Sequence, residues 1–361
     1  MKKIYTLAFL FLAAITIAQP PAGYYNSATG TGYTLKTQLH NIINDHNDRG
    51  YSGLYTTYTT SDKDFFYENN GTMLDMYTEN PTGAECEFTY GINQDDGTLG
   101  NNECERYNRE HLVPQSAFGG SGGTPMYSDA HFVVPSDKHV NAERGDFPFG
   151  RVETATYTAT NGSKKGQNTN SGYSTGYSGV VFEPIDEFKG DIARCLLYFA
   201  TRYQDVVTGF SYTMFNGTSN QVFTTPFLNI LLTWNQQDPV SAREVARNNA
   251  VYTRQSNRNP FIDNNSYVTS IWGAPLAAEY FSALSSVSVY PNPTNTRTIT
   301  IESATTLENI QLITINGQLL QEYKNPSAQG NSYLLQDLPQ GFYFVKLSAN
   351  QQTTTKKIVV N

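Results

Sequence analysis

The residues with the clearest chemical potential lie between Arg106 and Gly150. Glu110 and His111 are adjacent, and Asn141 follows thirty residues after His111. A neutral imidazole takes a proton from water near pH 7, and a carboxylate together with an amide oxygen is a hard ligand set that suits Mg²⁺. One metal ion and one imidazole are sufficient for phosphodiester hydrolysis, because the base activates the water and the metal neutralises the developing charge.

Two arginines and a second histidine accompany this set. Arg109 and Arg144 are suited to hold the non-bridging oxygens of a phosphate. An isolated Glu-His pair is weak evidence, since a single histidine is usually structural. The chain has only five histidines, however, and His111 and His131 each begin one of the two short apolar runs of this stretch.

The elements that must position these residues are a strand at HLVP, a glycine-rich loop, a strand at HFVVP and a short helix. Ser136 is the predicted N-cap of this helix, Asn141 lies within it and Gly145 ends it. This order predicts a ββα-metal finger. Apolar spacing predicts further helices near residues 34–45, 191–205 and 226–234, and one that opens at Asp238 and Pro239, whereas residues 161–179 are expected to form a flexible loop. The fold class is therefore α+β.

The net charge of −8 over 361 residues argues at first against a nucleic-acid partner. Residues 19–285 hold 17 basic and 28 acidic residues, so this segment is the acidic part of the chain. Residues 106–165, however, hold 7 basic and 6 acidic residues, and a bound metal adds positive charge there. The charge balance thus permits a nucleic-acid substrate and predicts weak binding without metal.

The two ends of the chain are predicted to be targeting segments. Residues 1–18 resemble a signal peptide, with Lys2 and Lys3 before an apolar run that is too short for a membrane span. We therefore expect a secreted protein without an integral membrane segment after its removal. From Ser286 to Asn361 short alternating strands, with a hairpin turn at Asn316-Gly317, predict a small β-sandwich.

Three cysteines are too few for a disulfide scaffold. Cys86 and Cys104 flank a polar loop, and whether they pair is left open by their spacing. Cys195 lies on the apolar face of a predicted helix and is expected to be a buried thiol.

Several longer stretches resemble the bacterial endonuclease I family of secreted or periplasmic Mg²⁺-dependent nucleases. They occur in order from Tyr24 to Trp272 and read YNREHLVPQS, MYSDAHFVVPSDKHVNAERGDFPFG, FEPIDEFKGDIAR, LLTWNQQDPVS, RNNAVYTRQSNRNPFID and YVTSIWG. The resemblance implies a ββα-metal active site that cuts DNA, and often RNA, with little sequence preference and leaves 5′-phosphates. The words VYPNPTN, LPQGFYFVKL and KKIVVN resemble the C-terminal sorting domain of the type IX secretion system, whose machinery is the implied partner of the tail.

The resemblance assigns roles to individual residues. His111 matches the general base, and Glu110 and Asn141 match the two metal ligands, while Arg144 matches the arginine of the V-N-x-x-R word. The resemblance therefore implies a catalytic role for Arg144 as well as for His111.

Other matches are candidates for phosphate or substrate binding. His131 belongs, with Asp129, to the D-x-H word, and Arg258 and Asn259 belong to the N-R-N-P-F word. Arg109 joins them because it precedes the Glu-His pair. Some family members carry a phosphate-clamping arginine after that pair, whereas residues 112–137 of this chain contain neither Arg nor Lys.

The expected organisation is a signal peptide over 1–18, a catalytic domain over 19–285 and a sorting domain over 286–361. Two other functions stay open. One alternative is a non-catalytic surface protein that binds nucleic acid or glycans on a nuclease scaffold. The other is a phosphodiesterase acting on other extracellular phosphoesters. The complete Glu-His-Asn set favours a catalyst.

Overall fold

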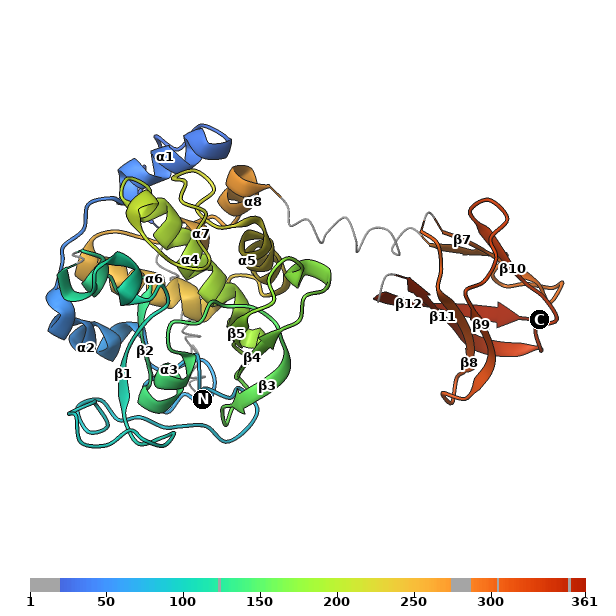
Figure 1. The fold of residues 1–361 in the computed structure, drawn as a ribbon, viewed down its shortest axis with the longest axis horizontal. Coiled ribbons are helices and arrows are strands. Elements are labelled where there is room, and N and C mark those ends of the chain that lie inside the picture. Colours follow the sequence, from blue (N-terminus) through green and yellow to red (C-terminus); the bar gives the residue numbers. More distant parts are fainter. Residues whose placement is uncertain (1–19, 123–124, 274–286, 304, 350–351) are drawn as a thin grey trace, which may run out of the picture. The chain divides into compact units, whose positions relative to one another are not determined.

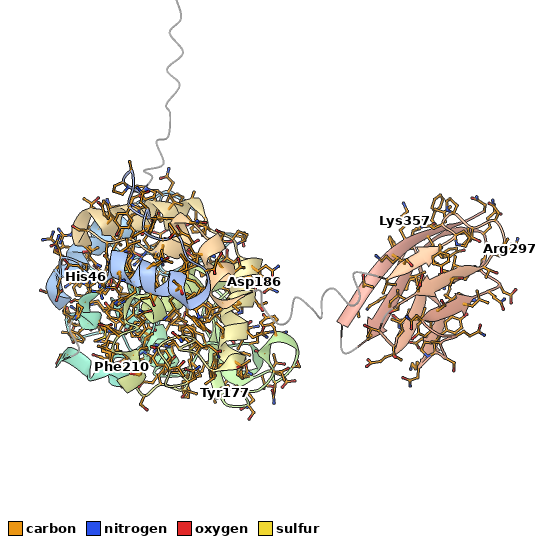
Figure 2. All side chains as sticks on the ribbon, turned by 90° about the horizontal axis from the view of Figure 1, so that it is seen from above. His46, Tyr177, Asp186, Phe210, Arg297 and Lys357 are labelled. Atoms are coloured by element: carbon orange, nitrogen blue, oxygen red, sulfur yellow. A yellow bond between two sulfur atoms is a disulfide. The ribbon has the colours of Figure 1, made fainter. Side chains whose placement is uncertain are left out.

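The computed structural model describes residues 20–122, 125–273, 287–303, 305–349 and 352–361. They form two compact units, drawn as ribbons in Figure 1 and with side chains in Figure 2. The first holds residues up to 169, 178–227 and 234–273, and the second holds the C-terminal strands with residues 170–177 and 228–233. The predicted signal peptide and the predicted boundary at residues 285 and 286 lie outside the described residues.

Helices make up most of the first unit. They are α1 (Gly32–Ile43), α2 (Gly50–Ser61), α3 (Lys138–Arg144), α4 (Lys189–Arg202), α5 (Thr225–Gln237, apart from its residues 228–233), α6 (Ala242–Gln255), α7 (Pro260–Asp263) and α8 (Ser266–Trp272). α4 is buried along its whole length and contacts α1 and α7, and α2 packs against α6. The core of this unit therefore surrounds α4.

Two small antiparallel sheets complete the first unit. One pairs β1 (Tyr107–His111) with β2 (Val133–Asp137), and the other has the order β3 (Val152–Thr158), β4 (Lys164–Asn168) and β5 (Val180–Glu183). In the first sheet Glu110 lies opposite Val134 and His111 opposite Val133. α3 follows β2 directly (Figure 1), so the predicted order of strand, strand and helix is present.

The predicted elements differ from the structure mainly at their ends. β1 ends at His111 instead of beginning there, and Asp137, not Ser136, caps α3 by accepting the amide N–H groups of His139 and Val140. Gly145 ends α3 as predicted, with a φ of 53°.

Three other elements also differ from the predictions. α6 begins at Ala242 behind a capping box of Ser241 and Glu244, not at the predicted Asp238. α2 was not predicted, because its Tyr- and Thr-rich sequence favours strands. Packing against α6, β2 and the 3₁₀ turn Met126–Ser128 stabilises the helix instead. β4 lies inside the expected loop 161–179, where its pairing with β3 and β5 outweighs a composition typical of loops.

The second unit contains two antiparallel sheets that share one hydrophobic core. Its strands are β6 (Ser288–Tyr290), β7 (Ile299–Glu302), β8 (Asn309–Thr314), β9 (Leu319–Lys324), β10 (Ser332–Leu335), β11 (Gly341–Ala349) and β12 (Gln352–Val360). One sheet has the order β10-β7-β6 and the other β12-β11-β8-β9. Ile301, Leu312 and Val345 are among the core residues that both sheets supply. The predicted hairpin at Asn316-Gly317 joins β8 to β9, and Gly317 has a φ of 83°.

Candidate active site

A pocket of about 360 Å³ lies where β1 ends beside α3. Its lining consists of Tyr51, Asn108, Arg109, Glu110, His111, Pro114, Gln115, Lys138, Asn141, Ala142, Arg144, Gly145 and Asp146. The structure thus brings Glu110, His111, Asn141, Arg109 and Arg144 together around one cavity. It does not place His131, Arg258 or Asn259 there.

The strand and helix periods explain this gathering. Successive side chains of a strand point to opposite faces, and side chains three apart on a helix share a face. Asn108 and Glu110, two apart on β1, therefore meet Asn141 and Arg144, three apart on α3. Arg109 and His111 point to the other face of β1, where both contact Tyr51, and the end of the strand brings the two faces to one pocket.

Glu110 is buried, with 3% of its surface exposed. Its Oε1 accepts hydrogen bonds from the hydroxyl of Tyr77 and from Nη1 of Arg144, both at 2.8 Å. Burial raises the pKa of the Glu110 carboxyl, while the charge of Arg144 and the Tyr77 hydroxyl oppose that rise. These two bonds orient the carboxyl group through Oε1, and neither of them uses Oε2.

Arg144 has its terminal nitrogens committed to the protein. Nη1 donates to Glu110 and to the carbonyl of His111 at 2.9 Å, and Nη2 donates to the carbonyl of Leu112 at 2.8 Å and to the hydroxyl of Tyr212 at 3.2 Å. The side chain is 1% exposed. The expected phosphate contact therefore does not fit its geometry, because all four terminal N–H bonds have protein acceptors. Arg144 instead fixes Glu110 and the end of β1.

His111 is held in one orientation by a carbonyl and by aromatic rings. Its Nε2 lies 3.2 Å from the carbonyl oxygen of Tyr127, and because a carbonyl only accepts, Nε2 carries the proton. The rings of Tyr51 and Tyr127 stack near the imidazole, with centroids 5.9 and 5.4 Å away. Burial lowers the pKa of His111 to about 4, so the ring is neutral at pH 7 and Nδ1 has a free lone pair.

The amide of Asn141 is oriented by its neighbour on β1. Nδ2 of Asn141 donates to Oδ1 of Asn108 at 2.7 Å, which assigns the amide orientation and turns Oδ1 of Asn141 away from Asn108. Asn108 was not predicted, although it lies within the YNREH word. Its signal was its position two residues before Glu110, on the same face of the strand.

Arg109 is the pocket arginine with hydrogen-bond donors to spare. Its guanidinium lies over the rings of Tyr51 and Tyr55, 3.5 and 4.2 Å from their centroids, and Nη1 donates to the carbonyl of Tyr51 at 3.0 Å. The neighbouring Lys138, by contrast, is bound to Asp95 and to the carbonyl of Leu99, both at 2.8 Å. Arg109 is therefore the predicted phosphate contact that the geometry favours.

The remaining predicted residues are buried in the scaffold. Arg258 is 1% exposed, and its guanidinium pairs with Asp263 at 2.7 Å. Asn259 is the N-cap of α7 and accepts from the amide of Phe261. His131 is 1% exposed, and its Nε2 lies 3.0 Å from the carbonyl of Asn257. None of the three reaches the pocket, so the expected phosphate contacts do not fit.

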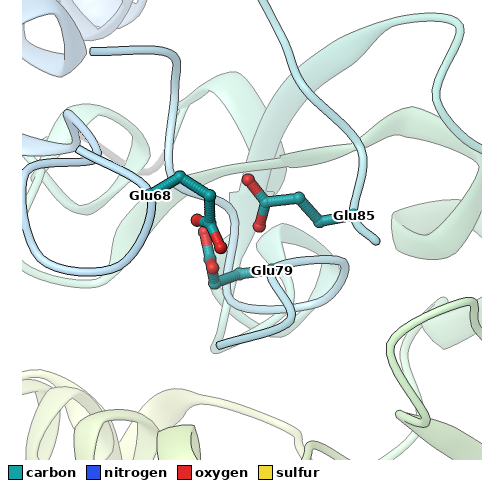
Figure 3. Close-up of side chains that lie close together, drawn as sticks. All are labelled: Glu68, Glu79 and Glu85. Carbon is teal, nitrogen blue, oxygen red and sulfur yellow. The ribbon is translucent and has the colours of Figure 1, made fainter. Parts of the chain in front are cut away.

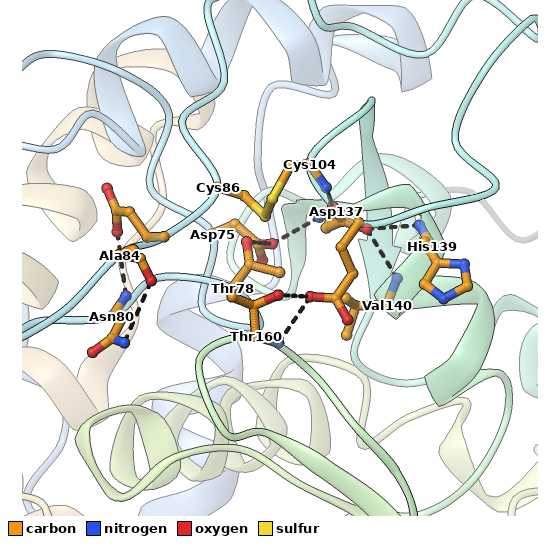
Figure 4. The surroundings of a disulfide bond; sticks show 12 residues. Asp75, Thr78, Asn80, Ala84, Cys86, Cys104, Asp137, His139, Val140 and Thr160 are labelled. Carbon is orange, nitrogen blue, oxygen red and sulfur yellow. Dashed lines mark hydrogen bonds between the residues drawn. A yellow bond between two sulfur atoms is a disulfide. The ribbon is translucent and has the colours of Figure 1, made fainter.

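A disulfide and a buried carboxylate hold the helix end of the site (Figure 4). Cys86 and Cys104 form a disulfide, and Oδ2 of Asp137 accepts the amide N–H of Cys104 at 2.7 Å. The amide of Asp137 donates to Oδ2 of Asp75 at 2.7 Å. The N-terminus of α3 is thereby tied to the loop that precedes β1. Cys195 is buried, as predicted.

The donors around the pocket fit a hard divalent cation. Glu110 offers a carboxylate oxygen and Asn141 an amide oxygen, and both groups are oriented by hydrogen bonds made through their other atoms. Mg²⁺ prefers oxygen ligands and usually keeps several waters, so two protein ligands are a sufficient set. A carboxylate, an amide and a neutral imidazole around one cavity are the groups that metal-dependent hydrolases use.

Comparison with known proteins identifies the family. The family model of endonuclease I matches residues 31–266, and that of the secretion system C-terminal sorting domain matches residues 288–361. The chain belongs to the endonuclease I family, whose nucleases are metal-dependent, and carries a type IX sorting domain at its C-terminal end.

Two relatives are extracellular ribonucleases of bacilli. The one from Bacillus amyloliquefaciens is 33% identical over 72% of this chain and 81% of its own length, and the one from Bacillus subtilis (strain 168) is 34% identical over 69% and 78%. A structure of PorZ, a type IX surface component of Porphyromonas gingivalis, matches 22% of this chain and 12% of its own at 18% identity, and its TM-score of 0.19 carries no argument. Within the described residues no helix is both long and apolar enough to cross a membrane. The sorting domain and the extracellular relatives show that the protein is a secreted or cell-surface nuclease.

Proposed function

We propose that this nuclease hydrolyses the phosphodiester bonds of DNA and RNA with Mg²⁺, through a ββα-metal finger formed by β1, β2 and α3. Glu110 and Asn141 hold the metal ion, and His111 is the general base. The observation that carries the proposal is the placement of these three side chains around one pocket, each oriented by a separate hydrogen bond.

The proton path starts at a water molecule beside Nδ1 of His111. Because Nε2 is committed to the carbonyl of Tyr127, only Nδ1 can accept that proton. The stacked tyrosine rings and the low pKa keep the imidazole neutral and ready to accept it. Arg109 binds a non-bridging oxygen of the phosphate with its remaining donors. The bound metal supplies charge neutralisation at the phosphate and the leaving oxygen.

Activity on both nucleic acids follows from the choice of nucleophile. Water attacks instead of a ribose 2′-hydroxyl, so the reaction does not require RNA, and the leaving oxygen is the sugar 3′-oxygen, which yields 5′-phosphates. The bacillar relatives are named ribonucleases, which supports RNA as one of the substrates. The small charge surplus around the site predicts cleavage with little sequence preference.

The test is cleavage of plasmid DNA and of a structureless RNA with MgCl₂ or with EDTA. We expect both polymers to be cut with Mg²⁺ only, and products that a 5′-phosphate-dependent exonuclease degrades. Glu110→Gln is expected to raise the Mg²⁺ concentration needed for half-maximal cleavage. Metal-independent cleavage, or unchanged Mg²⁺ demand in this variant, contradicts the proposal.

A further inference from the structure

Three glutamates gather in the segment between α2 and β1, away from the residues that line the active-site pocket. One carboxylate oxygen from each of Glu68, Glu79 and Glu85 lies within 4.8 Å of the other two. Figure 3 shows the three carboxyl groups pointing toward one another. Glu68 is exposed, Glu85 is half-buried and Glu79 is only 3% exposed. We refer to these residues as the glutamate cluster.

The buried member of the glutamate cluster has an unsatisfied oxygen. Oε1 of Glu79 has no hydrogen-bond partner in the described structure, although it is out of contact with solvent. An unpartnered buried carboxylate oxygen is unfavourable, so such groups are normally paired or bound to metal. Exposed acidic clusters need no ligand, whereas the buried Glu79 carboxyl needs either a proton shared with Glu85 or a bound cation.

A fourth carboxylate adds to the deficit of positive charge. Asp64 is fully buried; its Oδ1 accepts the amide N–H groups of Phe66 and Tyr67, while Oδ2 has no partner in the described structure. Its negative charge acts on both Glu79 and Glu85. No lysine or arginine of the described ranges forms an ion pair with Asp64 or with the glutamate cluster.

We propose that the glutamate cluster binds one Ca²⁺ ion, at a site separate from the catalytic metal site. Three carboxylates in an irregular loop suit Ca²⁺, which takes six to eight oxygens in flexible geometry. Mg²⁺ fits less well, because it demands a near-octahedral shell and usually keeps most of its waters. A secreted protein meets Ca²⁺ outside the cell, where sites commonly have dissociation constants of about 10⁻⁴–10⁻³ M.

The proposed ion would stabilise the loop that orients the catalytic carboxylate. The amide N–H of Glu79 donates to the carbonyl of Asp75 at 2.8 Å, and its own carbonyl accepts from Nδ2 of Asn161 at 2.9 Å. Tyr77, two residues before Glu79, donates to Glu110. Asp75 accepts the amide of Asp137 at the start of α3. An ion bound at Glu79 would therefore hold both Tyr77, which orients Glu110, and Asp75, which anchors the start of α3.

Thermal unfolding of the purified chain with CaCl₂ alone tests the proposal without reading nuclease activity. The measurements use the Asn141→Ala background, which removes one ligand of the catalytic site. At tenfold excess over the dissociation constant, Ca²⁺ is expected to raise the melting temperature by about 3–6 °C. Glu68→Gln, which changes an exposed side chain, is expected to abolish the rise. Glu87→Gln, an exposed acid of the same loop outside the cluster, is expected to retain it.

Calorimetric titration with CaCl₂ gives a second reading on the same variants and on Glu85→Gln. One binding site is expected in the background protein and in Glu87→Gln, and none in Glu68→Gln or Glu85→Gln. No rise in melting temperature up to 10 mM CaCl₂, about ten times the weakest expected dissociation constant, shows that the carboxyls share a proton instead and overturns the proposal. An equal rise in Glu68→Gln places the ion elsewhere, and an equal effect of MgCl₂ overturns the assignment to Ca²⁺.

Discussion

Replacing Arg144 by methionine separates a positioning residue from a phosphate contact. Methionine keeps much of the side-chain volume and removes the charge and all donors. The change leaves Glu110 without its buried cation, and it leaves the carbonyls of His111 and Leu112 without the donors that Arg144 supplies. If Arg144 fixes the end of β1, the loss appears in folding stability as well as in catalysis.

The expected size of that loss comes from the burial of the pair. The Arg144 and Glu110 side chains are 1% and 4% exposed and lie 2.8 Å apart. Removing one partner of a buried ion pair destabilises a protein by about 3–5 kcal/mol, because the other charge stays buried and unpaired. A domain of this size loses about 2–4 °C of melting temperature per kcal/mol. Arg144→Met is therefore expected to lower the melting temperature by roughly 6–20 °C.

Arg109→Met is the matched comparison, since Arg109 lies on the other face of β1. It loses contacts with two tyrosine rings, worth about 1 kcal/mol in partly exposed positions, and is expected to lower cleavage by about 10²-fold through the lost phosphate contact. Urea unfolding gives the free energy of unfolding for both variants, and the double variant Glu110→Gln/Arg144→Met is expected to lose less than the sum of the single changes. A loss below about 1 kcal/mol for Arg144→Met, or equal losses for both arginines, refutes the reasoning.

Three further predictions concern the supports of the site. Asn108→Ala frees the amide of Asn141 and is expected to raise the Mg²⁺ concentration for half-maximal cleavage by about 10-fold or more; an unchanged Mg²⁺ titration contradicts this. Burial lowers the pKa of His131 to about 4. Between about pH 6.5 and pH 4 the unfolded chain therefore binds a proton at this histidine and the folded chain does not. The free energy of unfolding should fall by up to about 3 kcal/mol over that range, and His131→Gln, followed by urea unfolding at several pH values, should flatten this fall. Replacing both Cys86 and Cys104, which are 18 residues apart, by serine should lower the free energy of unfolding by about 3 kcal/mol, measured by urea unfolding. An unfolding curve that matches wild type would show that the disulfide is dispensable.

The central motif was readable from the sequence because its residues are close along the chain. The strand and helix periods are enough to bring Glu110 to the face of α3 that carries Asn141, and His111 follows Glu110 directly at the end of β1. The family and the sorting domain were likewise predicted from short words, and the family models match both. A hairpin formed at Asn316-Gly317 as predicted, but only Gly317 of the pair has a positive φ, so the turn is not the type I′ turn that this dipeptide favours.

What the sequence did not provide are contacts between distant segments. Arg144 and Arg258 are both arginines in characteristic words, and nothing local reveals that each is committed to a buried carboxylate. Tyr77 and Tyr51 reach the site from the loop after α2 and from α2 itself, and no motif marks them. Their roles depend on how the scaffold packs.

The most direct test of the account is the cleavage rate of His111→Ala with saturating Mg²⁺. The account predicts a rate about 10²–10⁴-fold below wild type, with the Mg²⁺ affinity close to that of wild type, because Glu110 and Asn141 are untouched. A rate within about tenfold of wild type contradicts the assignment of His111 as the base that activates the water.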